Sequence, residues 1–360
     1  MMCKRIFAYQ TQSEGEIPFF KIGTIGSSPD AYISQELFDD YKEKYNYPRV
    51  NEVMITCAGT VGRCWQFDGT PSYYQDSNIV WIDNPQGKIS NNFIYRILER
   101  TDWSKLNSTT ITRIYNDNLR NLNCYYPAIE EQNKITDFLS LIDKRIEKQR
   151  QLVESLKKYK RGLFIQLYNQ SSKNKIQIKN LGEYFSAGIL SKDDLVENGS
   201  NPCILYGELF TKYNEVIQDI CSFTNKSLTT KTQGTEILFP SSTTVDALSL
   251  ICPSSINQSN VILGGDLFAI RLKKDFDNDF MSYLFNYIYK RLLAKFAQGI
   301  TIVHLHYSDI KEQFIEVPNV DEQIKIIKIV NNIEKYILKN EKIHENLKST
   351  KQGLLQQMFI

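Results

Sequence analysis

The stretch P-A-I-E-E-Q-N-K-I at residues 127–135 occurs again as P-N-V-D-E-Q-I-K-I at residues 318–326, an offset of 191 positions. In both copies a proline stands just before an acidic first turn, which is a favourable start for a helix. The same offset carries Lys160 onto Lys351 and Gly162 onto Gly353 without a gap. We therefore predict a long helix that occurs twice in the chain.

The duplication extends into the residues before each motif. Residues 53–56 (V-M-I-T) match 237–240 (I-L-F-P), and residues 78–82 (N-I-V-W-I) match 266–270 (D-L-F-A-I). Short runs of β-branched and aromatic residues between turn residues predict strands. Each copy therefore contains strands first and a long helix last. Pro18 and Gly23 also match Pro202 and Gly207.

The repeat predicts an α+β fold of two similar domains, each mixing β structure with helices and each followed by a long helix. One copy is longer than the other, because Lys175–Gly188 have no counterpart and Ile189 aligns near Arg5. The expected boundaries are a first domain at 1–126, its spacer helix at 127–168, a second domain at 169–317 and a second helix at 318–360.

Apolar residues recur every three or four positions along both predicted helices. This heptad spacing predicts an antiparallel coiled coil with pseudo-twofold symmetry. Gln149 and Asn340 occupy seam positions, where they either face each other and fix the register or reach the solvent at the rim. The other predicted seam residues are Leu139, Ile142, Ile146, Val153 and Leu156 on the first helix and Val330, Ile333, Ile337, His344 and Leu347 on the second.

Composition excludes several classes of protein. Of the 360 residues 42% are hydrophobic, yet no run reaches the ~18 apolar residues of a membrane-spanning helix. The first ten residues have no apolar segment of the kind that a signal peptide contains. The seven cysteines include no Cys-x-x-Cys pair, so neither a zinc site nor a disulfide framework is predicted. We expect reduced thiols in a cytoplasmic protein.

The charge distribution is uneven although the net charge is only +2. Residues 127–170 carry 9 Lys/Arg and 6 Asp/Glu, whereas residues 171–317 carry 14 and 16. A protein that holds DNA by itself through phosphate contacts is usually more basic. Either the chain does not bind DNA, or partner proteins supply much of the attraction.

Two loops carry side chains suited to DNA. The turn around Gly59 exposes backbone amides beside Arg63, and the second loop combines amide and aromatic groups that suit base edges. The alternatives are a plain hairpin turn and a polar strand entry. The candidate DNA-binding residues are Thr56, Gly59, Thr60, Arg63, Tyr73, Tyr74, Gln75 and Asn78 in the first copy and Ser241, Ser242, Thr243 and Thr244 in the second.

No catalytic or metal-binding motif is found in the sequence. It contains no Asn-Pro-Pro-aromatic methyltransferase motif, no Gly-rich cofactor loop after a strand and no Glu-x-Lys of a nuclease core. His304 and His306 have the spacing of two groups on one strand face. Their counterparts are Arg113 and Tyr115, and a third ligand is missing, so no metal site is predicted.

These features together resemble the specificity subunit of type I restriction–modification systems. The resemblance rests on the two Pro…Glu-Gln motifs, on the segments at 54–62 and 75–81, and on the repeated helix end at 156–163 and 347–354. It implies a non-catalytic subunit whose two repeated domains are target-recognition domains and read a bipartite, asymmetric site on double-stranded DNA. The implied partners are two methyltransferase subunits, which bind S-adenosylmethionine, and restriction/translocase subunits.

Two other classes remain open at this level. Duplication and heptads also suit a structural or signalling coiled-coil protein with two sensor domains and no DNA role. An enzyme with an unrecognised active site is the second alternative, although no coupled acid and base cluster is evident.

Overall fold

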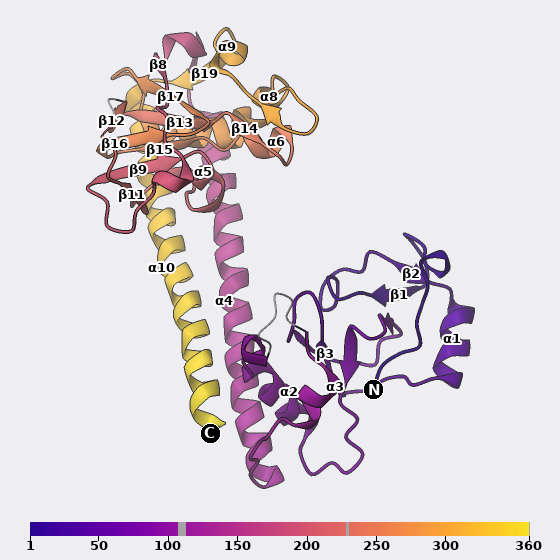
Figure 1. Cartoon of the computed structure of the whole chain (residues 1–360). Coiled ribbons are helices and arrows are strands. Elements are labelled where there is room, and N and C mark those ends of the chain that lie inside the picture. Colours follow the sequence, from indigo (N-terminus) through magenta and orange to yellow (C-terminus); the bar gives the residue numbers. More distant parts are fainter. Residues whose placement is uncertain (107–112, 228–229, 360) are drawn as a thin grey trace. The chain divides into compact units, whose positions relative to one another are not determined.

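The computed structural model describes residues 1–106, 113–227 and 230–359. The chain forms two compact units, and both long helices contribute to each of them. Unit 1 contains Met1–Gln151 and Glu341–Ile360, and unit 2 contains Leu152–Asn340. Figure 1 shows the elements of each unit. Among the described residues, no helix is long and apolar enough to cross a membrane.

Unit 1 has two three-stranded sheets, in the orders β2-β1-β5 and β4-β3-β6. Its elements are η1 (Ala8–Gln10), β1 (Ile17–Phe20), β2 (Tyr32–Ile33), α1 (Gln35–Lys44), β3 (Val53–Thr56), β4 (Cys64–Gln66), β5 (Tyr73–Tyr74), β6 (Ile79–Trp81), α2 (Asn91–Arg100), η2 (Trp103–Leu106) and α3 (Asn116–Arg120). Helix α4 (Ile129–Gln170) follows and continues into unit 2.

Unit 2 has sheets in the orders β10-β15-β13-β17-β8 and β11-β9-β16-β12, and the pairs β14-β18 and β19-β7. Its strands are β7 (Lys173–Gln177), β8 (Gly182–Ser186), β9 (Asn201–Leu205), β10 (Val216–Ile217), β11 (Ser222–Thr224), β12 (Lys231–Gln233), β13 (Glu236–Pro240), β14 (Ser242–Thr243), β15 (Ser254–Ile256), β16 (Ser259–Gly264), β17 (Leu267–Leu272), β18 (Val303–His304) and β19 (Phe314–Pro318). Its helical segments are η3 (Ile178–Asn180), η4 (Lys192–Asp194), α5 (Glu208–Thr211), α6 (Ala247–Leu250), α7 (Asn278–Leu284), the π-helical turn η5 (Phe285–Tyr289), α8 (Lys290–Ala294), α9 (Tyr307–Ile310) and α10 (Val320–Met358).

The two units repeat one topology, as the sequence repeat predicts. Strand β1 pairs parallel with β5 and antiparallel with β2, and β9 pairs in the same way with β16 and β11. Strand β3 pairs antiparallel with both β4 and β6, as β13 does with β15 and β17. The registers agree, because Met54 lies opposite Trp81 and its counterpart Leu238 lies opposite Ala269.

A fully buried glutamine joins each long helix to its domain. The side-chain oxygen of Gln132 accepts a hydrogen bond from the backbone N–H of Ser90 at 2.8 Å, and its nitrogen donates to the carbonyls of Lys88 and Pro127. Ser90 is the N-cap of α2, so one side chain ties the starts of two helices together. This joint explains the glutamine of the repeated motif.

Gln323 makes the equivalent three bonds in unit 2. Its oxygen accepts from the backbone N–H of Asp277, the N-cap of α7, and its nitrogen donates to the carbonyls of Asp275 and Pro318. Both glutamine side chains have no solvent exposure. A buried amide is tolerated at these positions because its oxygen and nitrogen both have backbone partners.

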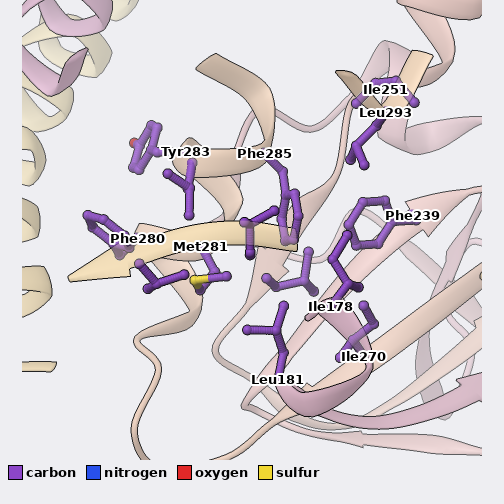
Figure 2. Close-up of a cluster of buried hydrophobic side chains, with 14 of the residues drawn as sticks. Ile178, Leu181, Phe239, Ile251, Ile270, Phe280, Met281, Tyr283, Phe285 and Leu293 are labelled. Carbon is purple, nitrogen blue, oxygen red and sulfur yellow. The ribbon is translucent and has the colours of Figure 1, made fainter. Parts of the chain in front are cut away.

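The long helices pack against each other within each unit. In unit 1 the apolar cluster around Leu139 includes Leu355 and Phe359 of the C-terminal helix segment together with Phe93 and Ile97 of α2. In unit 2 Phe164 and Tyr168 share an apolar cluster with Ile326 and Val330 in the first turns of α10. The same cluster includes Phe239 and Ile270 of the sheet (Figure 2). The start of one helix therefore meets the end of the other, which is the antiparallel direction.

The predicted seam positions lie away from solvent. Gln149 and Asn340 are each only 5% exposed, so neither side chain reaches the solvent at the rim of the seam. That the two side chains face each other stays a prediction. Leu139, Val153, Val330 and Ile337 are buried. The remaining predicted positions are partly buried, namely Ile142, Ile146, Leu156, Ile333, His344 and Leu347.

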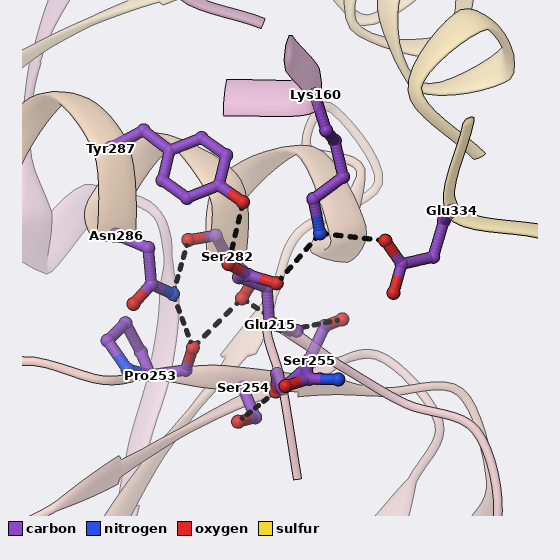
Figure 3. Close-up of polar contacts among 10 residues, drawn as sticks. Lys160, Glu215, Pro253, Ser254, Ser255, Ser282, Asn286, Tyr287 and Glu334 are labelled. Atoms are coloured by element: carbon purple, nitrogen blue, oxygen red, sulfur yellow. Dashed lines mark hydrogen bonds and ion pairs between the residues drawn. The ribbon is translucent and has the colours of Figure 1, made fainter. Parts of the chain in front are cut away.

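Each unit also contains a lysine held between carboxylates. In unit 2, Lys160 lies 2.7 Å from Glu334 of α10 and 3.1 Å from Glu215, whose other oxygen accepts from Tyr287 (Figure 3). Burial lowers the pKa of Lys160, but the two carboxylates more than offset this and the pKa is raised. In unit 1, Lys351 contacts Glu99 and Asp143. The repeat offset relates Lys160 to Lys351 and Asp143 to Glu334.

Replacing the buried glutamine of unit 1 tests the joint. Gln132→Leu leaves the N–H of Ser90 and two carbonyls without their partner, so we expect a loss of about 2–4 kcal/mol in the free energy of unfolding of unit 1. Tryptophan fluorescence during urea unfolding measures this, because Trp65, Trp81 and Trp103 are the three tryptophans of the chain. Gln352→Leu, at an exposed position of α10, is the control. An equal loss of unfolding free energy in both variants would contradict a stabilising role of Gln132.

Candidate nucleic-acid interface

The first candidate loop of unit 1 connects β3 to β4 and is closed by its own backbone. The N–H of Gly62 donates to the carbonyl of Thr56 at 2.9 Å, and the N–H of Arg63 donates to the Thr56 hydroxyl at 3.0 Å. Gly62 has φ +84°, and a Cβ there would lie 2.2 Å from Trp103. These constraints leave Gly59, Thr60 and Arg63 exposed at the surface.

A second loop lies against the first. The N–H of Cys57 donates to the carbonyl of Asn78 at 2.7 Å, which fixes the segment after β5 beside the β3–β4 loop. Gln75 is held from two sides, since its N–H donates to the carbonyl of Phe20 and its side-chain oxygen accepts from the N–H of Ile22. The turn after β1 therefore joins the same group of loops.

Cationic side chains surround these loops. Arg113 donates to the carbonyl of Ser77 at 3.3 Å, and Arg5 forms an ion pair with Asp76 at 2.8 Å. Arg5 and Lys21 line a shallow cavity of about 340 Å³ together with residues 75–78. Arg63, Arg113, Arg5 and Lys21 thus form a basic border on one group of loops, a charge arrangement that suits phosphates.

Three candidate residues of unit 1 belong to the core instead of the surface. Tyr73 and Tyr74 form β5 and are 0% and 2% exposed, and Thr56 is fully buried. The hydroxyl of Tyr74 bonds to Ser72 at 2.8 Å, and Thr56 bonds to the backbone of its own loop. We therefore assign these three side chains a packing role and remove them from the candidate DNA contacts. The sequence prediction took β5 for the end of a loop because two residues are too short to show a period.

The candidate residues of unit 2 lie at the equivalent place. The N–H of Leu305 donates to the carbonyl of Ser241 at 2.9 Å, as the N–H of Ile114 donates to that of Cys57 in unit 1. The hydroxyl of Ser242 donates to Asp266, so this side chain is buried and supports the loop. Thr244 is exposed, and Ser241 and Thr243 are partly exposed.

A groove of about 880 Å³ opens beside this loop. The groove is lined by the turn after β9, the loop after β13, Asp266 ahead of β17, the strand β18 and the helical segments that carry Asn286 and Lys290. The first three are the counterparts of the three segments that meet in unit 1. Residues of the groove that the sequence prediction missed are Tyr206, Phe210, Asn286 and Lys290. The match of Gly207 to Gly23 could have pointed to the neighbouring Tyr206 as a groove residue. Nothing in the sequence indicated that Lys290 would lie there.

His304 lines the groove at the position of Arg113. Its ring stacks with that of His306, with centroids 6.1 Å apart. Within the described residues, no group of three or more His, Cys, Asp or Glu could hold a metal ion. His304 therefore places an imidazole in the groove where unit 1 has an arginine.

The cysteines near these loops are poor nucleophiles. Burial raises the pKa of Cys57 to about 11 and that of Cys64 to about 12. Both therefore remain protonated thiols at neutral pH. What the loops offer is a set of hydrogen-bond donors, acceptors and cations, which suits binding.

Comparison with known proteins identifies this architecture. The family described as "Type I restriction modification DNA specificity domain" matches twice, at residues 2–158 and 171–349. The chain belongs to this family. Each match contains one domain and most of the long helix that follows it. Members of the family are specificity subunits, which are non-catalytic.

Individual relatives agree with the family match. A Haemophilus influenzae protein, named as a type I restriction enzyme specificity subunit, is 49% identical over 143 residues. This similarity covers 40% of the chain and 36% of that relative's length. The solved S subunit of the type I system from M. genitalium has a TM-score of 0.55 at 17% identity, covering 100% of this chain and 93% of the other. A chain from a study of type I system assembly and conformational transition has a TM-score of 0.57 at 14% identity, covering 95% and 90%.

Removing single cations from the two loop groups tests the interface of the specificity subunit. Arg63→Ala and Lys290→Ala should each weaken DNA binding by roughly three- to tenfold and reduce the slope of log K against log salt by about one. Fluorescence anisotropy at several salt concentrations measures both quantities. Lys44→Ala, at an exposed ion pair on α1, is the control. Slopes unchanged from the wild type in both variants would exclude these loops as the DNA-facing surface.

Proposed function

We propose that this chain is the DNA-recognition subunit of a type I restriction–modification complex and that it reads a bipartite, asymmetric target. The observation that carries the proposal is the equivalence of the two loop groups. The same three segments meet in each unit, held by the same hydrogen bond to Cys57 or Ser241. A repeated scaffold with the same loop positions is suited to reading two half-targets.

The two loop groups differ in the side chains that they expose. Unit 1 offers Arg63, Gln75 and Arg113, whereas unit 2 offers Thr244, Lys290 and His304. Arginine and glutamine can each contact a base edge through two hydrogen bonds, whereas a hydroxyl contacts bases or phosphates less selectively. This chemical difference supports an asymmetric target, with a different sequence in each half.

The proposed complex contains catalytic partners. We propose that it has two methyltransferase subunits, which bind S-adenosylmethionine, and restriction/translocase subunits. The net charge of only +2 supports partners that contribute to holding DNA. The free cysteines and the DNA target support a cytoplasmic location.

The long helices offer one apolar position per repeat to such a partner. Phe138 on α4 is 46% exposed, and its repeat counterpart Ile329 on α10 is 44% exposed. Phe138 is in unit 1 and Ile329 is in unit 2. We propose that each is part of a docking surface for one methyltransferase subunit, since large apolar side chains at protein interfaces contribute much of the affinity.

Exchanging one recognition domain tests the reading of two half-targets. Replacing residues 1–126 with the corresponding segment of a relative should change one half of the methylated sequence and leave the other half unchanged. Methylation mapping of the complex with its methyltransferase partner shows the result. The matched control replaces residues 169–317 and should change only the other half. If either exchange altered both halves, the modular function would be wrong.

Single charges on the helices test the two docking surfaces. Phe138→Asp and Ile329→Asp should each weaken binding of one methyltransferase subunit at least about tenfold, because each places a carboxylate in an apolar contact. Native mass measurement should then show one bound subunit for each single variant and none for the double variant. Lys144→Asp, at an exposed position of α4, is the control. Two bound subunits in the double variant would refute this placement.

A further inference from the structure

Two exposed aliphatic side chains line the groove of unit 2. Val245 is 71% exposed and follows β14, and Ile302 is 47% exposed and precedes β18. Because β14 pairs antiparallel with β18, the residues after the first strand continue beside those before the second. Leu248 and Ile300, on the same two segments, are also exposed. Two segments far apart in sequence thus place an apolar surface at the groove.

Hydrogen bonds on both sides fix the backbone of Val245. Its N–H donates to the hydroxyl of Thr243 at 3.3 Å. The next residue, Asp246, caps the start of α6 by accepting from the N–H of Ser249 at 2.7 Å. The side chain of Val245 therefore stands on a defined turn between β14 and α6.

A tight hairpin holds Ile302 at the same groove. Gln298 and His304 exchange backbone hydrogen bonds of 2.9 and 2.7 Å, as paired residues of an antiparallel ladder do. Gly299 has φ +129°, and a Cβ there would lie 1.9 Å from the carbonyl oxygen of Ile302, so the hairpin requires glycine. Both aliphatic residues thus stand on ordered backbone, and binding through them costs little conformational entropy.

Unit 1 shows that this exposure is not imposed by the fold. Val61 lies four residues after Cys57, and Val245 lies four residues after Ser241, which makes the same backbone bond as Cys57. Val61 packs against the apolar cluster that includes Trp103. An apolar surface that is exposed in a groove, although the fold can bury such a residue nearby, marks a site of interaction.

The polar residues of the groove indicate what the apolar surface contacts. Lys290 of α8 (Figure 1), Asn286 and His304 line the same groove. The major groove of DNA has phosphates at its border and hydrogen-bonding base edges inside it, and thymine is the one base that adds a methyl group there. A DNA duplex therefore matches the cation, the polar side chains and the aliphatic pair together.

We propose that Val245 and Ile302 contact thymine methyl groups in the major groove and thereby select T·A base pairs in the half-target of unit 2. The inference rests on the proposed function, since it names a chemical group that one half-target presents. Burial of one methyl group corresponds to about a fourfold difference in affinity. A change to another base would also remove hydrogen bonds, so the methyl group has to be varied alone.

Uracil provides this test because it differs from thymine by the methyl group only. The target of the complex with its methyltransferase partner is mapped by methylation, and the exchange of residues 169–317 shows which half unit 2 reads. Each thymine of that half is then replaced with uracil, one at a time, and the affinity is measured by fluorescence anisotropy. We expect at least one replacement to lower the affinity about fourfold. Uracil in the gap between the half-targets is the control and should have no effect.

Variants of the two residues assign the contact. Val245→Thr keeps the size of the side chain and replaces a methyl group with a hydroxyl, and Ile302→Ala shortens the second side chain. At the thymine that each residue contacts, the preference over uracil should fall from about fourfold toward equal affinity. The slope of log K against log salt should stay that of the wild type, because no charge changes. Ile189→Ala, at an exposed residue of unit 2 that does not line the groove, is the control and should keep the full preference.

The outcomes separate this inference from the proposed function. Equal affinity for thymine and uracil throughout that half, or a half-target without thymine in either strand, would overturn the inference and leave the reading of two half-targets intact. Full preference for thymine in both variants would also overturn it. The uracil measurement uses the unaltered chain, so it can overturn the inference even where a variant does not fold. If the domain exchange altered both halves, the proposed function itself would be wrong.

Discussion

The structure depends on the buried glutamine at the start of each long helix. Gln132 and Gln323 each bind three backbone groups, two of which belong to the turn before a domain helix. A helix N-terminus leaves unpaired N–H groups, and here the partner side chain comes from a second helix. The bond therefore fixes the angle between domain and helix. The same domain helices also contact the other long helix, since Phe93 packs against Phe359 and Phe280 packs against Phe164.

Because the joint recognises main-chain atoms, the residues around it are free to differ. Ser90 and Asp277 are different side chains in the same role, and Lys88 and Asp275 have opposite charges. This freedom accounts for a chain in which the helix motif is repeated closely while the two domains in front of it differ.

The sequence was informative where a pattern repeats. The motif at 127–135 and 318–326 and the heptad spacing identified both long helices, since a 3.6-residue period over forty positions has few alternatives. Strand β3 was predicted with its observed bounds for a similar reason, because its equivalent in the second copy supports it. Gln132 was visible in the motif, but its three backbone partners come from residues that no spacing rule connects.

The candidate contacts were harder to predict because exposure is a tertiary property. Tyr73 and Tyr74 have the composition of a binding loop, yet parallel pairing with β1 places both in the core. Lys290 lies far from Ser242 in sequence, and only the packing of α8 against α6, and of α6 against β14, brings it to the same groove. Glu215 likewise had no sequence signal, although it shares the Lys160 ion pair.

The lysine clusters have a consequence for the origin of the chain. Lys160 pairs with Glu334, and Lys351 pairs with Asp143, so each helix supplies one lysine and one acid. The repeat offset of 191 converts one ion pair into the other. A single copy of the repeat therefore carries both the lysine and the acid that such a pair requires. An ancestral chain of half this length would thus have carried an isologous, self-matching surface and could have assembled as a twofold homodimer. Gene fusion would then have released the two halves from identity, and each set of loops could acquire its own sequence.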